Sequence, residues 1–594
     1  MCGIVACRTN SPAADYLLVA LRRLEYRGYD SVGVAVRTIT GDVARIRTVG
    51  RIGALDRAVR SWAGAELDGV GIGHTRWATH GAVTEDNAHP HIDCTGRISV
   101  VHNGIIENFE VLRRALALSG HSFSSAVDSE VLCHLIEDQL EASGDLFEAV
   151  GAALTAVEGS WALAVLDQLT GRVVVASNRS PLLIARTADG DFAASDIAAV
   201  ADWVDEFRVL EDGDIVELSG DRGWQDSTVG ARAPVIARCI WRGKDVDLNG
   251  YVDYMAKEID EQPAAAARVL EQLGDGVVSG ELWTDLGLPP FDRLQVIGCG
   301  TSLNAGRVIG NLVRRLGGIP VNLTVASESA DEIVEPRTLC LSISQSGETA
   351  DVLHALASRA SDGPVLALTN NPHSTLARRA DALLTCAAGP EVGVAATKTF
   401  VCQVIAGSAL MISALVASKR LSKAVAAELV DELHRLPDRL ATAGTVAKCL
   451  VPPIAEEVSA ASGFLFIGRG SGLPYAAEGA LKLKELTYRW AEYYPAGELK
   501  HGPLALVSDG TPVVVIDNAD PKLATNVAEV SARGGRIISL GAAGATIPVL
   551  GAKNAPWGPL ESVIPMQILA RTLGLALGWD VDKPRNLAKS VTVE

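Results

Sequence analysis

Short apolar runs that alternate with turn-forming residues fill the chain up to about residue 240. Gly, Asp and Asn separate these runs, and long helical patterns are few. Runs of this kind, bounded by turn residues, are typical of β-strands. They read GIVAC, SVGVAV, GVGIGHT, ISVVHNG, WALAVL, RVVVASN and GDIVEL. We therefore expect a strand-rich α+β domain over residues 1–238.

The pattern changes near residue 240, where a polar, glycine-containing stretch precedes a run with helical spacing. The stretch WRGKDVDLNGYVDYM leads into MAKEIDEQPAAAARVLEQL, whose helical pattern is interrupted by Pro263. These features predict a linker and a connecting helix over residues 239–286.

From about residue 290 onward, apolar strand runs alternate with helical runs rich in Ala, Leu and Val. The strand runs are LQVIGCG, VNLTVAS, LCLSIS, PVLALTN and ALLTCAA. Strands separated by helices predict a doubly wound parallel α/β sheet. A weaker echo begins near residue 463, with FLFIGRGSG, TPVVVIDN and GGRIISLG. We expect two diverged copies of one unit, over residues 287–450 and 451–594, of which one kept a role that the other lost.

The composition is that of an ordinary globular protein. The 594 residues, 48% hydrophobic and 21% charged, suffice for about three domains with large cores. The formal net charge of −18 argues against a nucleic-acid or anionic-membrane partner, because such partners need clustered Lys and Arg. The ten cysteines are scattered singly, and neither a signal sequence nor a long uninterrupted apolar run is evident. We expect a cytoplasmic protein.

The second residue raises the first question of chemistry. Removal of the initiator Met would leave Cys2 with both a free α-amine and a thiol, which is a nucleophile that carries its own base. The alternative is that Cys2 is a small apolar residue at the start of the strand CGIVAC.

Several polar sets stand beside apolar strands in the first domain: HTRWATHG (74–81), NAHPH (87–91), HNG (102–104) and SAVDSE (125–130). A thiolate that attacks an amide builds charge on the amide oxygen, so the Asn103 side chain and the Gly104 N–H would make an oxyanion hole. Arg76 and Asp128 suit the charged ends of an amino-acid substrate. The histidines of these sets could instead bind a metal ion, but no HExxH or paired cysteines support this, so we expect no metal. They are His74, His80, His89 and His91.

Two turns in the first α/β unit, CGTS (299–302) and SQSGET (344–349), each follow a strand and open a helical run. Hydroxyls and backbone N–H groups at a helix N-terminus can bind a phosphate without lysine, although ordinary helix capping would look the same. The candidate phosphate ligands are Thr301, Ser302, Ser344, Gln345, Ser346 and Thr349. The dinucleotide fingerprint is incomplete and no Walker lysine is present, so we expect no nucleotide or other cofactor.

The second α/β unit carries titratable residues at helical spacing. In AAEGALKLKELTYRWAEYY, Glu478, Lys482 and Glu485 fall on one helix face, as a surface ion-pair ladder or as a proton-transfer site would. His501 follows in a loop with Gly and Pro. Lys589 lies in the C-terminal tail, which either frays or folds over a site and brings an amine to a carbonyl.

Taken together, these segments resemble the glutamine:fructose-6-phosphate aminotransferase (isomerising) family over the whole chain and in order. The matching motifs are MCGIVA, LRRLEYRGYDSVG, HTRWATHG, NAHPH, VVHNGIIEN, CGTS, SQSGETAD, EGALKLKE, GELKHGPLAL and KPRNLAKSVTVE. The resemblance implies an N-terminal-nucleophile glutaminase with sandwiched antiparallel sheets, followed by two sugar-isomerase (SIS) units. It also implies synthesis of glucosamine 6-phosphate from fructose 6-phosphate and glutamine by a homodimer.

The resemblance assigns roles residue by residue. Cys2 would release ammonia from glutamine at the Asn103–Gly104 oxyanion hole, and Arg27 and Trp77 would close the site and gate an ammonia channel. The glutamine-binding residues would be Arg76, Thr79, His80 and Asp128. The sugar phosphate would lie on the six candidate phosphate ligands, with Glu478 and Lys482 as supports. Lys589 would form a Schiff base, Glu485 would move the proton between C1 and C2, and His501, from the neighbouring subunit, would assist ring opening.

The sequence departs from the family at three positions, namely Ala6 in place of Gly, Asp253 in place of His and Ala396 in place of Ser. These departures leave open a paralogue that acts on another keto-sugar phosphate. A non-catalytic sugar-phosphate sensor is a further alternative, but it gives no reason for Cys2, Glu485 or Lys589. Replacing Cys2 by Ala separates the two classes, since a sensor has no glutamine hydrolysis to lose. A phosphoribosyl-transferring amidotransferase would need an acidic diphosphate-sugar signature, which is not found in the sequence.

Overall fold

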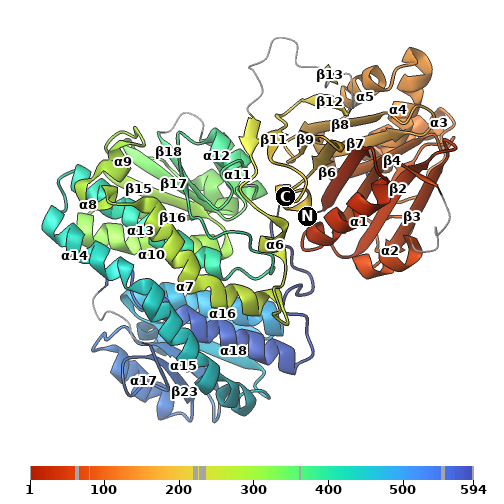
Figure 1. The fold of residues 1–594 in the computed structure, drawn as a ribbon. Helices are drawn as coiled ribbons and strands as arrows, with labels where there is room; N and C mark the ends of the chain where they lie inside the picture. Colours follow the sequence, from red (N-terminus) through yellow and green to blue (C-terminus); the bar gives the residue numbers. More distant parts are fainter. Residues whose placement is uncertain are drawn as a thin grey trace. The chain divides into compact units, whose positions relative to one another are not determined.

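The computed structural model describes residues 2–59, 66–78, 80–218, 225–226, 236–359, 363–549 and 555–591. The chain forms two compact units, Met1–Asp247 with Ala588–Glu594, and Leu248–Leu587 (Figure 1). Of the predicted site residues, Thr79 lies outside the described residues.

Two antiparallel sheets make up the centre of the first unit. The strands of the larger sheet are β1 (Gly3–Thr9), β2 (Ser31–Thr38), β3 (Val43–Val49), β4 (Leu67–Arg76), β9 (Leu183–Thr187), β10 (Gly190–Ala194), β11 (Glu206–Val209) and β14 (Ile236–Arg238). Those of the smaller sheet are β5 (His91–Ile92), β6 (Ile98–Ile106), β7 (Gly159–Asp167), β8 (Val173–Asn178), β12 (Ile215–Leu218) and β13 (Gln225–Asp226). Within the described residues the strand orders are β14-β11-β9-β10-β1-β4-β2-β3 and β13-β12-β8-β7-β6-β5. Each predicted strand run of this domain overlaps one of these strands.

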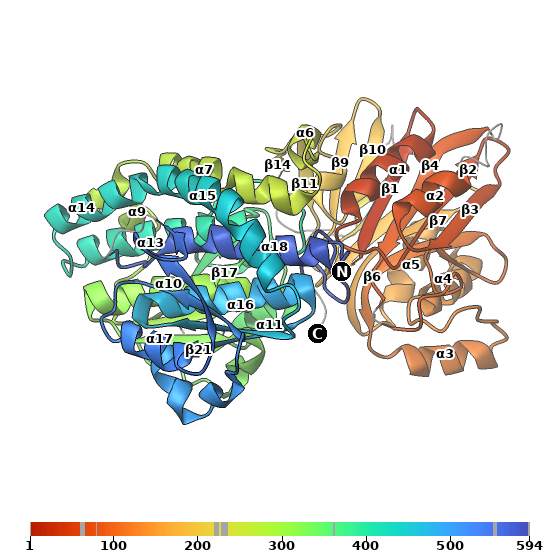
Figure 2. The same ribbon diagram turned by 90° about the horizontal axis from the view of Figure 1, so that it is seen from below.

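Hydrophobic side chains on both faces of β1 explain how the larger sheet packs between the smaller sheet and a helix. Successive side chains of a strand point to opposite faces, so Ile4 and Ala6 pack toward the smaller sheet whereas Val5 and Cys7 pack under a helix. Figure 2 shows helices outside both sheets. They are α1 (Ala13–Leu24) and α2 (Ile52–Val59) on the larger sheet, and α3 (Phe109–Leu118), α4 (Glu130–Ser143) and α5 (Leu146–Leu154) on the smaller side; α6 (Gly243–Val246) follows β14. The expected sandwich is confirmed.

The second unit contains two parallel sheets built in the same way. The first has β15 (Arg293–Gly298), β16 (Val321–Val325), β17 (Thr338–Ser344), β18 (Val365–Thr369) and β19 (Ala382–Thr385). The second has β20 (Gly463–Gly468), β21 (Trp490–Pro495), β22 (Pro512–Ile516), β23 (Arg536–Gly541) and β24 (Ile547–Pro548). Their orders, β16-β15-β17-β18-β19 and β21-β20-β22-β23-β24, follow one pattern. The predicted duplication of an α/β unit is therefore confirmed.

Helices pack around both parallel sheets. They are α7 (Tyr254–Leu273), α8 (Gly276–Ser279), α9 (Glu281–Thr284), α10 (Gly300–Gly317), α11 (Ala350–Ser358), α12 (Thr375–Arg379), α13 (Lys398–Ala417), α14 (Lys423–His434), α15 (Leu436–Glu457), α16 (Leu473–Thr487), α17 (Leu523–Ser531) and α18 (Val563–Ala576). The helices α15, α18 and α16 lie side by side (Figures 1 and 2). α7 runs through Pro263, where the sequence pattern predicted an interruption.

α13 is long and apolar enough to cross a membrane, with a mean hydropathy of 2.1 over its most apolar window. However, 94% of that window is buried inside the protein, where α13 packs against α10 and α7. Its composition is therefore that of a core helix.

The departure at Asp253 has a local structural role. Its carboxylate caps α7 by accepting a hydrogen bond from Ala256 N at 2.7 Å, and it accepts another from Arg571 Nε on α18 at 2.9 Å. A capping carboxylate that also pairs with arginine stabilises the start of this helix.

Candidate functional site

Cys2 stands at the start of β1, where two neighbouring strands hold the backbone. Gly3 is paired with Thr75 of β4, and Ile4 N donates to Ser195 Oγ at 3.0 Å. The half-buried Cys2 Sγ accepts a hydrogen bond from Trp77 N at 3.2 Å. Burial raises the pKa of the thiol, and the Trp77 N–H and the Arg76 charge oppose this rise. A thiol in this state needs a base before it can attack.

Asn103, on β6 between β7 and β5 of the smaller sheet, turns its amide nitrogen toward the cysteine. Its Nδ2 donates to Cys2 O at 3.0 Å, and its Oδ1 lies 3.0 Å from His74 Nε2. Burial lowers the pKa of His74 to about 3, so the ring is neutral at pH 7. Its Nε2 also lies 3.1 Å from His102 O, and a ring nitrogen between two oxygens must carry the proton. His74 thereby fixes which end of the Asn103 amide faces Cys2.

Gly104 occupies a backbone conformation that only glycine tolerates. Its φ is +133°, and a Cβ added there would meet Ser160 O at 2.0 Å. Any side chain would therefore displace β7, which pairs with β6 along its whole length. This requirement explains the glycine next to Asn103.

Arg76 and Asp128 are buried charges held by backbone groups. The guanidinium of Arg76, which is 3% exposed, donates to His80 O. Burial lowers the pKa of Arg76, and the charges of Cys2, Asp30 and Asp128 oppose this shift. Asp128 Oδ2 accepts from Ile106 N at 2.9 Å. Arg76 interacts electrostatically with both Cys2 and Asp128, and two buried charges of opposite sign can bind the carboxylate and ammonium of an amino acid.

Arg27 and Trp77, the predicted gating residues, differ in how they are held. The buried Arg27 forms an ion pair with Asp196 and donates from Nε to Tyr26 Oη at 3.2 Å. Burial lowers the pKa of Arg27, but Asp196 and Tyr26 outweigh it and the net shift is upward. The Trp77 ring meets the Tyr29 ring edge-on at 5.4 Å.

In the second unit, the α16 residues meet the start of α10. Lys482 Nζ lies 2.6 Å from Glu485 Oε2 and 3.6 Å from Glu478 Oε1. Glu478 accepts from Thr301 Oγ1 at 3.0 Å and from Asn304 Nδ2 at 2.9 Å. Burial raises the pKa of Glu478; burial would lower that of Lys482, but the two carboxylates raise it. The predicted shared face of Glu478, Lys482 and Glu485 is present, and it belongs to a buried network rather than a surface ladder.

The candidate phosphate ligands lie at the carboxyl ends of two adjacent parallel strands. β15 pairs with β17, and the turn after β17 is closed by a 2.8 Å hydrogen bond between Ser344 Oγ and Thr349 Oγ1. Within this turn Ser346 Oγ accepts from Glu348 N at 3.1 Å, and Gln345 is half-buried. Ser302, at the start of α10, accepts from Gln403 Nε2 at 3.1 Å. The carboxyl edge of a parallel sheet is where α/β proteins bind ligands.

Gly347 at the centre of this turn has a φ of +67°, and a Cβ there would meet Ser374 Oγ at 2.0 Å. Glycine therefore lets the turn pass close to Ser374. Gly347 N also donates to Ser344 Oγ at 3.0 Å, which helps to close the turn.

Two domain families match the chain in the same order as its two units. The Glutamine amidotransferase domain matches residues 74–202, and the SIS domain matches residues 290–413 and 459–547. Glutamine–fructose-6-phosphate aminotransferases (isomerizing) from Thermus thermophilus and Pseudomonas aeruginosa are each 42% identical to the chain, with 100% of both chains covered. The chain belongs to the glutamine–fructose-6-phosphate aminotransferase (isomerizing) family.

A solved structure agrees with this family assignment for the second unit. The C-terminal domain of the glucosamine-fructose-6-phosphate aminotransferase from Francisella tularensis is 34% identical to this chain, with a TM-score of 0.53. The match covers 57% of this chain and 100% of the Francisella domain. The aminotransferase family thus accounts for both parallel sheets as well as for the amidotransferase unit.

His501 and Lys589 are not brought to the α16 network within the second unit. His501 is exposed at the end of the 3-10 turn Ala496–His501. The tail Ala588–Glu594, which carries Lys589, groups with the amidotransferase unit. Their roles in the aminotransferase reaction therefore stay predictions.

The sequence did not indicate two residues that position the proposed site residues, namely Asn304 in the SIS unit and His74 in the amidotransferase unit. Asn304 binds Glu478, and its position one helical turn after Thr301 was the available signal. His74 was considered only as a metal candidate, because its tautomer follows from burial and partners that the sequence does not display.

Proposed function

We propose that the chain converts fructose 6-phosphate and L-glutamine to glucosamine 6-phosphate and L-glutamate. The supporting observation is that one chain carries both halves of the chemistry. In its amidotransferase unit the Asn103 amide donates to Cys2 and Arg76 interacts with the thiol, and in its SIS unit Thr301 of the CGTS turn donates to the Glu478–Lys482–Glu485 network. The family relatives of this chain are named for that conversion.

In the proposed first half-reaction, the Cys2 α-amine takes the thiol proton and Sγ attacks the amide carbon of glutamine. Asn103 Nδ2 and Gly104 N–H would stabilise the oxyanion. When the tetrahedral intermediate collapses, the α-amine passes the proton to the leaving nitrogen, which departs as ammonia. The remaining thioester reacts with water and gives glutamate and the free thiol. Arg76 and Asp128, with Thr79 and His80, would hold the charged end of glutamine.

In the proposed second half-reaction, the six phosphate ligands hold fructose 6-phosphate while His501 assists ring opening. The Lys589 amine condenses with the C2 carbonyl and releases water. Ammonia then displaces Lys589 from C2, and Glu485 moves a proton from C1 to C2, which converts the ketose into the amino aldose. Lys482, 2.6 Å from Glu485, would fix that carboxylate, and Glu478 would fix Lys482.

Ammonia transfer between the two half-reactions is part of the proposal, with Arg27 and Trp77 as its gate. The hydrogen bond from Trp77 N to Cys2 Sγ supports a role of Trp77 next to the reacting thiol. The buried ion pair with Asp196 would hold the Arg27 side chain in one position of the gate. Domain limits of 1–238, 239–286, 287–450 and 451–594, and a cytoplasmic location, complete the proposal.

One of the two SIS sheets would bind the sugar phosphate. In the second sheet, the place that corresponds to the phosphate turn is a cavity of about 330 Å³ whose polar lining is Arg315, Ser471, Asp517, Asn518 and Asp520. The two carboxylates repel a phosphate and oppose the attraction of Arg315, whereas the turn after β17 offers hydroxyls and N–H groups. We therefore assign the phosphate to the first sheet.

Product analysis tests the proposed reaction. With amide-15N glutamine and fructose 6-phosphate, mass spectrometry should find the label in glucosamine 6-phosphate, and Cys2→Ala should abolish both labelling and glutamine hydrolysis. Hydrolysis with the sugar unchanged would favour the paralogue acting on another keto-sugar phosphate, an alternative that the relatives do not favour.

The proposed homodimer is tested by complementation, because His501 would come from the partner subunit. Light scattering should give twice the 62.2 kDa of one chain. The variants His501→Ala and Lys589→Ala should each be inactive, and their co-expressed mixture should regain about one quarter of the activity, since half of the dimers are mixed and each has one intact site. A mixture without activity would contradict the shared site.

A further inference from the structure

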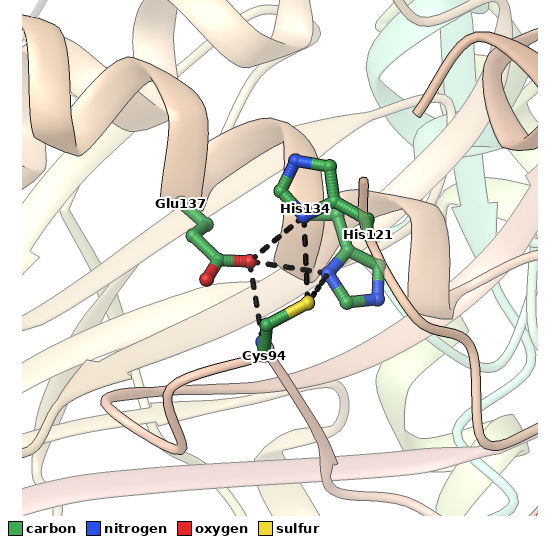
Figure 3. Close-up of side chains that lie close together, drawn as sticks. All are labelled: Cys94, His121, His134 and Glu137. Carbon is green, nitrogen blue, oxygen red and sulfur yellow. Dashed lines mark hydrogen bonds and ion pairs between the residues drawn. The ribbon is translucent and has the colours of Figure 1, made fainter. Parts of the chain in front are cut away.

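A second cluster of reactive side chains lies in the amidotransferase unit, apart from the residues assigned to glutamine. It contains Cys94, His121, His134 and Glu137, whose ligand atoms all lie within 4.8 Å of one another. Cys94 belongs to the turn between β5 and β6, and His121 follows α3. His134 and Glu137 lie one turn apart on α4. Figure 3 shows the thiol, one nitrogen of each ring and one carboxylate oxygen pointing toward a common centre.

Four of the six distances between the ligand atoms of this cluster agree with a tetrahedral zinc site, and all six lie within 4.8 Å. Cys94 Sγ lies 3.5 Å from His121 Nδ1 and 3.5 Å from His134 Nδ1. Glu137 Oε2 lies 3.1 Å and 3.2 Å from the same two nitrogens. With zinc bonds of about 2.3 Å to sulfur and about 2.0–2.1 Å to nitrogen and oxygen, tetrahedral geometry requires about 3.5 Å for S···N and about 3.3 Å for N···O.

The surroundings also suit a metal ion. His121 Nε2 lies 2.9 Å from Asp138 Oδ1, and a carboxylate on the far nitrogen is the usual support of a metal-bound histidine. Cys94 Sγ also accepts a hydrogen bond from Ser122 N at 3.5 Å, which helps to hold the sulfur in place. A thiolate and a carboxylate would neutralise a divalent cation. One thiolate, two imidazoles and one carboxylate form a donor set that zinc prefers.

We propose that Cys94, His121, His134 and Glu137 bind one zinc ion as a structural site of the amidotransferase unit. Four protein ligands fill a tetrahedral zinc and leave no position for substrate, so the site stabilises rather than catalyses. It would tie the turn before β6 to α4. β6 carries Asn103 and Gly104, and Asp128 lies two residues before α4. By linking these two elements, the zinc would stabilise the positions of the proposed oxyanion hole and of Asp128.

This proposal differs from the sequence-based expectation of no metal ion. That expectation considered His74, His80, His89 and His91 and looked for paired cysteines. The actual cluster uses one cysteine and two histidines from three separated segments, and its only local signal is the i, i+3 spacing of His134 and Glu137.

The competing explanation is a metal-free network in which the two ring nitrogens of His121 hydrogen-bond to Glu137 and Asp138. The full-length protein, chelator-treated and then equilibrated with zinc and desalted, should contain one zinc per chain by elemental mass spectrometry. Cys94→Ser and Glu137→Gln should lose stoichiometric zinc. Glu137→Gln keeps an oxygen that accepts hydrogen bonds, so a hydrogen-bonded network would survive it. The matched controls are Cys449→Ser and Glu428→Gln, which change exposed residues of the other unit.

Cobalt gives a second readout that does not depend on activity or on yield. The cobalt-loaded protein should show a thiolate-to-cobalt charge-transfer band and the intense visible bands of tetrahedral cobalt. The charge-transfer band should vanish in Cys94→Ser and persist in Cys449→Ser. A chelator should also lower the Tm of the parent protein and leave that of Cys94→Ser unchanged. Failure of the parent protein to take up zinc, or equal uptake by Cys94→Ser, would overturn the proposal.

Discussion

The arrangement of His74, Asn103 and Cys2 predicts a specific pattern of kinetic losses. Removing an oxyanion-hole donor costs about 100- to 1000-fold in kcat, so Asn103→Ala should lower glutaminase kcat by that factor with little change in KM for glutamine. His74 Nε2 lies against the amide oxygen of Asn103 and the carbonyl oxygen of His102, while its ring stacks on His89, and loss of one neutral hydrogen bond costs about 0.5–1.5 kcal/mol. His74→Ala should therefore lower kcat by about 2- to 13-fold.

The double variant separates a positioning role from a general loss of structure. Because His74 acts through Asn103, His74→Ala should cost nothing further once Asn103 is Ala. Glutamate release from glutamine is the assay, and sugar binding at the SIS unit is the control for folding. Additive losses in the double variant, or an Asn103→Ala enzyme within about 3-fold of the parent, would refute this reasoning.

Three further predictions concern the buried network, the phosphate turn and pH. Lys482→Ala leaves two carboxylates close together and should lower the unfolding free energy of the second unit by about 3–5 kcal/mol, as measured by urea unfolding, while glutaminase activity persists. Gly347→Ala should raise KM for fructose 6-phosphate at least about tenfold and leave KM for glutamine unchanged, because a Cβ there meets Ser374 Oγ at 2.0 Å; equal KM values would contradict the assigned turn. The pKa of His74 is about 3 in the folded protein and about 6.5 in the unfolded chain. Between about pH 3 and about pH 6.5 the unfolded chain therefore binds more protons than the folded protein. Stability should therefore rise with pH in this window by up to about 1.4 kcal/mol per pH unit from this residue, and His74→Phe should flatten the slope of Tm against pH.

Local sequence patterns predicted much of the fold because strands repeat every two residues and helices every 3.6 residues. The run GIVAC lies in β1, with Val5 and Ile4 on opposite faces. The strands that alternate with helices after residue 290 form two sheets with the same strand order. The spacing of Glu478, Lys482 and Glu485 placed them on one helix face, which the structure confirms.

The remaining features depend on contacts between distant segments. The binding of Glu478 by Asn304 joins residues 174 positions apart, and Cys94 meets His134 across 40 positions. The neutral state of His74 results from burial, which no local pattern measures. His501 and Lys589 were singled out by motif, and their roles require a tail and a partner subunit to reach the sugar.

Nitrogen freed at Cys2 should reach the sugar without mixing with ammonia in solution. A competition experiment supplies amide-15N glutamine and fructose 6-phosphate in the presence of excess unlabelled ammonium. The glucosamine 6-phosphate should carry the label almost completely, and the active chain should have an intact mass that lacks the initiator Met. Product labelled only in proportion to the mixed ammonia pool, or an active chain that keeps its Met, would contradict this expectation.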